Sequence, residues 1–191
     1  MKIGFFGGCF NPPTIAHIAL AKKALTYGKL DKVIVVPVGD FYKKRELASA
    51  KHRYNMLKIE TEELKNIEVS DMEIGIKEKI YAIDAFKLIK EKFSDDDIYF
   101  IMGADNFVNI MNWKDGKELI NEYKYIVLER ENIDLDEYIN KKLKAYKDRI
   151  IIIKNEEYKG FSSSKFRQNL KQNQNMISSK VMKYIKENNL F

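Results

Sequence analysis

The first seventeen residues restrict the fold of this chain more than any other stretch. Residues 2–6 are a short apolar run, followed by a pair of glycines and, a few residues later, by a pair of prolines. Such a run predicts a buried strand, and the glycines and prolines exclude a helix before Thr14. From Ile15 the apolar residues recur at helical spacing. We therefore expect a strand, a turn and then a helix that Thr14 caps and Gly28 ends.

A strand, a glycine turn and a helix N-terminus form an anion-binding arrangement in parallel α/β proteins. Gly7 and Gly8 lack a Cβ, so a phosphate can approach the main chain there. Thr14 and His17 are one helical turn apart, so both side chains can face the same ligand. The spacing is neither G-x-G-x-x-G nor a P-loop. Taken alone, two glycines and one histidine favour an ordinary turn with a solvent-facing histidine.

Six apolar segments alternate with amphipathic ones along the whole chain. Strands are predicted at residues 2–6, 31–38, 67–72, 98–102, 123–129 and 149–154, and helices at 15–28, 49–65, 82–93, 134–147 and 178–188, with one more after 162. This alternation predicts an α/β fold with a single doubly wound parallel sheet. We expect residues 1–191 to form one domain.

The composition limits where the protein works and what it binds. No apolar stretch approaches the roughly 18 residues of a membrane span, and the N-terminus lacks a signal-peptide pattern, so we expect a cytoplasmic protein without a membrane partner. One cysteine and two histidines exclude an intramolecular disulfide and disfavour a zinc site. The net charge of +6 comes from dispersed lysines, which favours a polyanionic small molecule over nucleic acid. The oligomeric state stays open.

Polar residues follow several predicted strands, at the edge of a parallel sheet where ligands bind. Lys43 and Lys44 lie in a basic loop after the second strand, and Gly103 and Asp105 follow the fourth. A charge run is also typical of a solvated loop. The lysines are candidate phosphate ligands only because their loop starts at the carboxyl edge of the sheet, where ligands bind. Trp113, the only tryptophan, has polar neighbours, which favours a surface or ligand-stacking position at least as much as the core.

A second informative string, F-S-S-S-K-F-R, occupies residues 161–167. Serines at a helix start cap it through their hydroxyls, and taken alone this string favours a well-capped helix. Ser162, Ser163 and Ser164 can equally hold an anion, with Arg167 as a bidentate clamp.

Together these strings carry a resemblance. G-G-x-F-N-P-P-T-x-x-H at residues 7–17 resembles the first signature of the nucleotidylyltransferase superfamily, and residues 161–167 resemble its second, I-S-S-[TS]-x-[IV]-R. H-R-x-x-M-L at 52–57, I-M-G-A-D-N at 101–106 and Y-I-x-x-N-x-L-F at 184–191 extend it. Over its whole length the chain is similar to the bacterial nicotinate-nucleotide adenylyltransferase family, which implies a Rossmann-like nucleotidylyltransferase fold.

The resemblance implies transfer of adenylate from ATP to nicotinate mononucleotide, giving deamido-NAD and pyrophosphate. It implies Mg²⁺ carried by ATP, with no metal ligand from protein side chains. His17 and Thr14 would be the catalytic residues. The implied ATP-binding residues are Gly7, Gly8, Phe10, Thr14, His17, Lys43, Lys44, Gly103, Asp105, Ser162, Ser163, Ser164 and Arg167, and the implied acceptor-binding residues are Tyr81, Ala82, Asp105, Trp113 and Arg130.

Three departures from the family pattern keep other interpretations open. Thr14 stands where the family has its first histidine, and Ala16 stands where it has a glycine. Ala82 replaces a threonine that helps to recognise the nicotinate carboxylate. One alternative is the same reaction with another phosphate acceptor, such as phosphopantetheine or nicotinamide mononucleotide. The other is a non-catalytic protein that binds nucleotides or nucleic acid.

Overall fold

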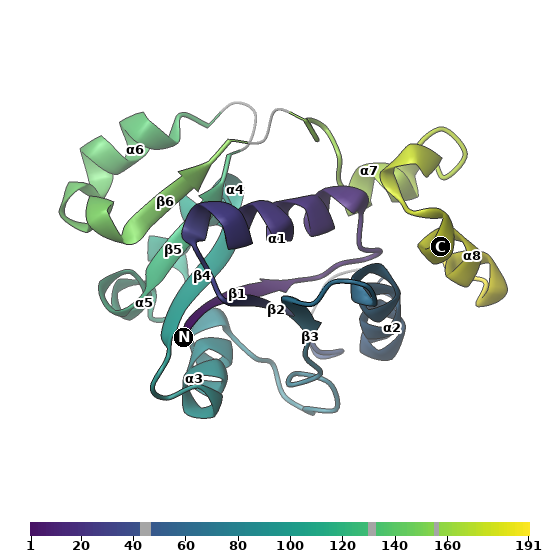
Figure 1. The fold of residues 1–191 in the computed structure, drawn as a ribbon, viewed down its shortest axis with the longest axis horizontal. Coiled ribbons are helices and arrows are strands. Elements are labelled where there is room, and N and C mark those ends of the chain that lie inside the picture. Colours follow the sequence, from purple (N-terminus) through teal and green to yellow (C-terminus); the bar gives the residue numbers. More distant parts are fainter. Residues whose placement is uncertain (43–46, 130–132, 155–156) are drawn as a thin grey trace.

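A single sheet of six parallel strands forms the centre of the computed structural model, which describes residues 1–42, 47–129, 133–154 and 157–191 (Figure 1). The strand order is β3-β2-β1-β4-β5-β6, and every neighbouring pair is parallel. This arrangement confirms the predicted doubly wound sheet. The strands are β1 (Lys2–Gly8), β2 (Lys32–Pro37), β3 (Ile67–Val69), β4 (Asp97–Gly103), β5 (Lys124–Leu128) and β6 (Ile150–Ile153).

Helices connect the strands and extend beyond the last one. The α-helices are α1 (Ile15–Gly28), α2 (Ala50–Thr61), α3 (Ala82–Lys92), α4 (Ala104–Phe107), α5 (Gly116–Glu122), α6 (Leu135–Lys142), α7 (Ser163–Gln168) and α8 (Ser179–Glu187). Short 3-10 helices are η1 (Ile110–Asn112), η2 (Lys144–Arg149) and η3 (Gln174–Met176). Every helix that the structure describes is too short or too polar to cross a membrane.

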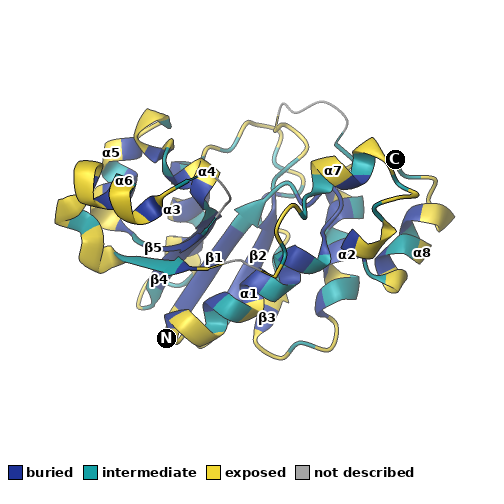
Figure 2. Cartoon of the chain, turned by 90° about the horizontal axis from the view of Figure 1, so that it is seen from above, coloured by how far each residue is buried: buried dark blue, intermediate teal, exposed yellow. Residues whose placement is uncertain are grey.

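Both faces of the sheet are covered because alternate residues of a strand point to opposite sides. In β4, Ile98, Phe100 and Met102 enter one hydrophobic cluster, and Tyr99 and Ile101 enter another. Helices α3, α5 and α6 complete the first cluster, and α1 and α2 complete the second. Figure 1 shows α1 and α3 on opposite sides of the strands, and Figure 2 shows buried strands between helices with exposed outer faces. The continuous apolar runs in the sequence are thus doubly covered strands.

The C-terminal segment packs on α2 through a third hydrophobic cluster. Met56 of α2, Phe166 of α7 and Ile185 of α8 belong to it, and α7 and α8 lie beside α2 in Figure 1. In addition, His52 Nδ1 lies 2.9 Å from the hydroxyl of Tyr184. This packing carries α7, with its serines, to the same end of the sheet as the N-terminus of α1.

The strand before the glycine turn is longer than predicted. The sequence predicts its end at residue 6, but β1 continues through Gly7 and Gly8, which pair with Val36 and Pro37 of β2. Within the strand the glycines also make room for aromatic rings, since a Cβ on Gly8 would lie 3.1 Å from Cζ of Phe10. The turn therefore starts at the residue after Gly8.

Other predicted boundaries shift because a short turn or a buried residue interrupts the pattern. Helix α2 ends at Thr61 instead of residue 65, and β3 ends at Val69 instead of residue 72. The helix predicted over residues 134–147 is broken at Leu143, a buried residue with φ −132°, between α6 and η2. Helix α1 does end at Gly28, but the left-handed residue is Lys29, and a Cβ on Gly28 would lie 2.6 Å from Cδ1 of Ile126.

Candidate active site

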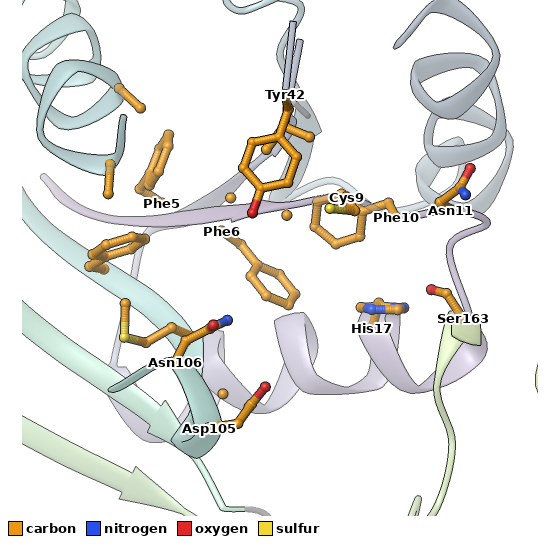
Figure 3. A pocket seen from close by; sticks show the side chains of 18 of the residues that line it. Phe5, Phe6, Cys9, Phe10, Asn11, His17, Tyr42, Asp105, Asn106 and Ser163 are labelled. Carbon is orange, nitrogen blue, oxygen red and sulfur yellow. The ribbon is translucent and has the colours of Figure 1, made fainter. Parts of the chain in front are cut away.

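A pocket of about 430 Å³ opens at the carboxyl ends of β1, β2 and β4 (Figure 3). Its wall also includes the start of α3, the start of α4 and the start of α7. In an open parallel sheet this is the edge where ligands bind, beside the strand order reversal at β1 and β4. The pocket thus lies where the sequence places its candidate residues.

Most of the predicted site residues line this one pocket. They are Gly7, Gly8, Phe10, His17, Tyr81, Ala82, Gly103, Asp105, Trp113, Ser162, Ser163, Ser164 and Arg167. Thr14 is completely buried and contacts His17 from behind the wall. Lys43, Lys44 and Arg130 lie outside the described residues.

His17 is held in a defined orientation by Thr14. The backbone N–H of Thr14 donates to Nδ1 of His17 at 2.9 Å, and Oγ1 of Thr14 lies 2.7 Å from the same nitrogen. Since Nδ1 accepts a backbone hydrogen bond, the proton of the neutral ring belongs on Nε2. His17 lines the pocket, so its Nε2–H is the donor that the ring can offer to a ligand.

Phe10 supports His17 from the other side. Its ring is 2% exposed, with its centroid 5.2 Å from that of His17 and 5.3 Å from that of Phe6. Phe10 has φ +46°, a left-handed conformation that costs a bulky residue about 1–2 kcal/mol. The contacts of the buried Phe10 ring with the rings of Phe6 and His17 hold the residue in this conformation.

The turn between β1 and α1 is fixed by side chains from distant segments. Ser163 Oγ donates to the carbonyl of Pro12 at 2.8 Å, and a guanidinium nitrogen of Arg167 donates to the carbonyl of Asn11 at 2.5 Å. The side-chain oxygen of Asn11 accepts from the N–H of Ala48 at 2.9 Å. The peptide bond before Pro12 is cis. These contacts join the two ends of the chain at the pocket.

The serine string does two tasks in the structure. Ser162 Oγ accepts from the N–H of Lys165 at 3.1 Å, so it caps α7 as the structural interpretation predicts. All three serines and Arg167 also line the pocket. Ser162 thus caps α7 at the place where all three serines face the pocket.

The opposite end of the pocket is formed by the N-terminus of α3. Ala82 is its first residue, and the N–H of Tyr81 donates to the carboxylate of Asp84 at 3.1 Å. The ammonium groups of Lys79 and Lys114 lie 4.3 and 4.7 Å from the centroid of the Tyr81 ring. Both lysines lie outside the pocket lining, and Lys114 also pairs with Asp84 at 3.4 Å, so these cations hold the Tyr81 ring through cation–π contacts.

Trp113 lies partly buried at the same end. Its ring meets that of Phe100 edge-on, with centroids 6.4 Å apart, and it also lines the pocket. Trp113 thus combines the two positions that the sequence left open, because its ring packs on the core and also faces the pocket.

Sequence reasoning missed three polar residues on the other wall. Tyr42 points into the pocket from the side opposite Asp105, and Glu73 lines it although only 4% exposed (Figure 3). Glu73 accepts a hydrogen bond from the N–H of Gly39 at 3.2 Å, and burial raises its pKa to about 6. Arg53, completely buried, holds backbone carbonyls behind the wall. Arg53 lies in the H-R-x-x-M-L string that carries the family resemblance, but the sequence pattern does not show that Arg53 or Glu73 is buried.

The pocket offers few metal ligands. Its described acidic side chains are Asp105 and Glu73, and no three histidine, cysteine or acidic side chains gather anywhere in the described part of the chain. Mg²⁺ is typically held by one or two carboxylates together with substrate phosphates and water. This donor set fits an ion that arrives bound to a nucleotide.

The strand order and the pocket define a nucleotide-binding protein of the doubly wound α/β class. The family model described as Cytidylyltransferase-like matches residues 5–169, and the chain belongs to that family.

Curated relatives are more specific. A protein from Acholeplasma laidlawii is 34% identical over 187 residues, covering 97% of this chain and 95% of the relative. One from Fusobacterium nucleatum is 36% identical over 193 residues, covering 98% and 96%. Both are named "Probable nicotinate-nucleotide adenylyltransferase". The family resemblance predicted from the motifs is confirmed.

A solved structure supports the fold. The nicotinic acid mononucleotide adenylyltransferase of Plasmodium falciparum, complexed with NaAD, matches with a TM-score of 0.84 at 25% identity. The match covers 99% of this chain and 96% of that chain. The Rossmann-like fold predicted from the sequence is therefore confirmed.

Proposed function

We propose that the protein transfers the adenylyl group of ATP to nicotinate mononucleotide, giving deamido-NAD and pyrophosphate, a step of NAD biosynthesis. One observation supports this most strongly: a single pocket joins a polar end, with His17 and Arg167, to an aromatic end, with Tyr81 and Trp113. Relatives of nearly full length carry the name of this activity, and the solved relative is complexed with NaAD, the dinucleotide that the reaction makes.

ATP phosphates fit the end of the pocket where two helices begin. The N-terminus of α1 favours an anion through its backbone N–H groups and its dipole. Nε2–H of His17, the serine hydroxyls and the remaining guanidinium donors of Arg167 add hydrogen bonds. Gly103 and Asp105, at the end of β4, are placed to meet the nucleoside. Lys43 and Lys44 remain candidate phosphate ligands.

The acceptor fits the end formed by α3 and Trp113. The indole offers a face for a pyridine ring, and the backbone N–H of Ala82 lies at a helix N-terminus, where a carboxylate is favoured. Arg130 remains a candidate acceptor ligand. In this orientation the phosphate of the acceptor points towards the glycines of β1 and the phosphates of ATP.

The reaction then needs positioning and charge stabilisation without a covalent enzyme intermediate. An oxygen of the acceptor phosphate forms a bond to the α-phosphorus of ATP. The bond from the α-phosphorus to the bridging oxygen breaks, and pyrophosphate leaves with that electron pair. His17 donates from Nε2 to the phosphate oxygens on which charge develops. Mg²⁺ that arrives with ATP would further neutralise the charge of the phosphates.

The experiment is pyrophosphate release from ATP and Mg²⁺, with three acceptors offered separately: nicotinate mononucleotide, nicotinamide mononucleotide and phosphopantetheine. Release with nicotinate mononucleotide alone supports the proposal and shows that Ala82 is tolerated. Release with another acceptor keeps the adenylyl transfer and changes the substrate. Release with none of them contradicts the proposal and favours a protein that binds nucleotides without catalysis.

A further inference from the structure

Arg53, in the first turn of α2, is 0% exposed. Its guanidinium donates three hydrogen bonds to backbone carbonyls: to Ala48 at 2.8 Å, to Cys9 at 3.0 Å and to Val38 at 2.7 Å. The carboxylate of Asp40 lies 3.8 Å away and is 55% exposed. Arginine is almost never fully buried without a close charged partner, so a guanidinium used mainly to hold carbonyls calls for an explanation.

The three carbonyls belong to three different segments. Cys9 follows β1, Val38 follows β2 and Ala48 precedes α2. Cys9 and Val38 both line the pocket. One side chain therefore joins the ends of two neighbouring strands to the helix behind them, at the point where the chain turns around the proposed phosphate site.

The hydrogen bonds also orient the peptide groups. In a trans peptide the C=O and the following N–H point in opposite directions. The carbonyl of Val38 faces Arg53, and the N–H of Gly39 accordingly points the other way, to the carboxylate of Glu73 at 3.2 Å. The carbonyl of Cys9 also faces Arg53, which turns the N–H of the next residue away from it. Arg53 thus sets the direction of two peptide groups beside the pocket, of which the N–H of Gly39 is taken up by Glu73.

Neighbouring carboxylates partly balance the charge of Arg53. Burial lowers the pKa of Arg53, but guanidinium groups stay protonated in proteins. The carboxylates of Asp40 and Glu73 act on this pKa in the opposite direction. The positioning therefore rests on the three hydrogen bonds to carbonyls and not on the charge.

The geometry assigns Arg53 a positioning role: it fixes the turn after β1 against the loop after β2, so that this part of the pocket wall already has its final shape when a nucleotide binds. A preorganised site stabilises developing charge without reorganisation at the moment of reaction. The role in turnover rests on the proposed function, whereas the positioning itself is measurable with ATP alone.

The test compares Arg53→Lys with Arg149→Lys. A lysine keeps the charge but cannot hold three carbonyls in a fixed fork. Arg149 is an exposed arginine outside the pocket lining that donates to the carbonyl of Asn121, so it is the matched control. Two properties are measured: kcat/KM for ATP, and the rate at which a thiol reagent labels Cys9, the only cysteine.

For Arg53→Lys we expect kcat/KM to fall at least about tenfold while the melting temperature stays above that of the assay. We also expect Cys9 to be labelled several times faster, with weaker protection by ATP, because the turn is no longer held. Arg149→Lys should leave both properties at the wild-type values.

Several results would overturn the inference. One is a folded Arg53→Lys with both properties within about twofold of wild type; another is a lower melting temperature as its sole change. If Arg53→Lys does not fold, Arg53→Gln takes its place, and failure of both to fold shows a role in folding alone. If the wild-type protein transfers no adenylate, the proposed function is overturned. Even then, the positioning would be supported if ATP protects Cys9 from labelling in wild type and this protection is lost in Arg53→Lys. Absence of that protection in wild type overturns the positioning as well.

Discussion

The backbone N–H of Thr14 donates to Nδ1 of His17 at 2.9 Å, and this contact fixes which nitrogen of the ring faces the pocket. Thr14 is completely buried, so its side-chain contact with the same nitrogen, at 2.7 Å, is shielded from water. The residue that departs from the family pattern at this position therefore still has a task, because it orients the histidine.

His17→Ala should abolish most turnover while the protein stays folded. Removing one preoriented donor to a developing negative charge typically lowers kcat by about 10²–10³. His52→Ala is the matched control, since the only other histidine lies on α2 and contacts Tyr184 outside the pocket. Steady-state pyrophosphate release measures both variants. Near-normal activity of His17→Ala would contradict the catalytic assignment.

Thr14→Val should have a smaller effect than His17→Ala. Valine has the shape of threonine but lacks Oγ1, and the backbone hydrogen bond to Nδ1 remains. Loss of one hydrogen bond of about 1 kcal/mol corresponds to a roughly fivefold lower kcat. Thr14→Ser should recover most of the activity. Thr26→Val, on the exposed side of the same helix, is the control, and equal kcat values for all variants would show that Oγ1 does not support His17.

The sheet was predictable because its strands are continuous apolar runs and because βα turns occur between them. The same runs did not show where β1 ends, since the pairing of Gly7 and Gly8 with β2 depends on a neighbour distant in sequence. Helices α4 and α5 were not predicted: they have four and seven residues, too few for a helical period to be recognised.

The candidate site was predictable where a motif names the residue type, as at His17 and Arg167. It was not predictable where function depends on burial. Arg53 follows Lys51 and His52, whereas Glu73 lies between Met72 and Ile74, and in both cases only tertiary packing encloses the charged group. Tyr42 is aromatic, but nothing in its local pattern places it on the pocket wall.

Trp113→Ala should raise KM for the acceptor by at least about fivefold and leave KM for ATP close to wild type, because a stacked ring contributes about 1 kcal/mol beyond its burial. Trp113→Phe should recover part of the loss. Tyr27→Ala, an exposed aromatic residue on α1, is the control. Equal increases in both KM values would place the indole elsewhere than at the acceptor.

Glu73→Gln should change how stability depends on pH. Burial raises the pKa of Glu73 to about 6 in the folded protein, above its ordinary value of 4.5. Below pH 4.5 both states are protonated, and as the pH rises towards 6 the unfolded state loses its proton first. Wild type therefore loses stability through this window, by about 2 kcal/mol from the shift of the pKa. Glutamine can still accept the hydrogen bond from Gly39 but has no charge to bury.

The free energy of unfolding, from urea titrations at pH 4.5, 5.5 and 7, measures this effect. The difference between Glu73→Gln and wild type should grow in favour of the variant between pH 4.5 and 6, and then stay constant. Parallel curves for the two proteins would mean that the hydrogen bond from Gly39 and the charge of Arg53 fully offset the desolvation of the carboxyl group.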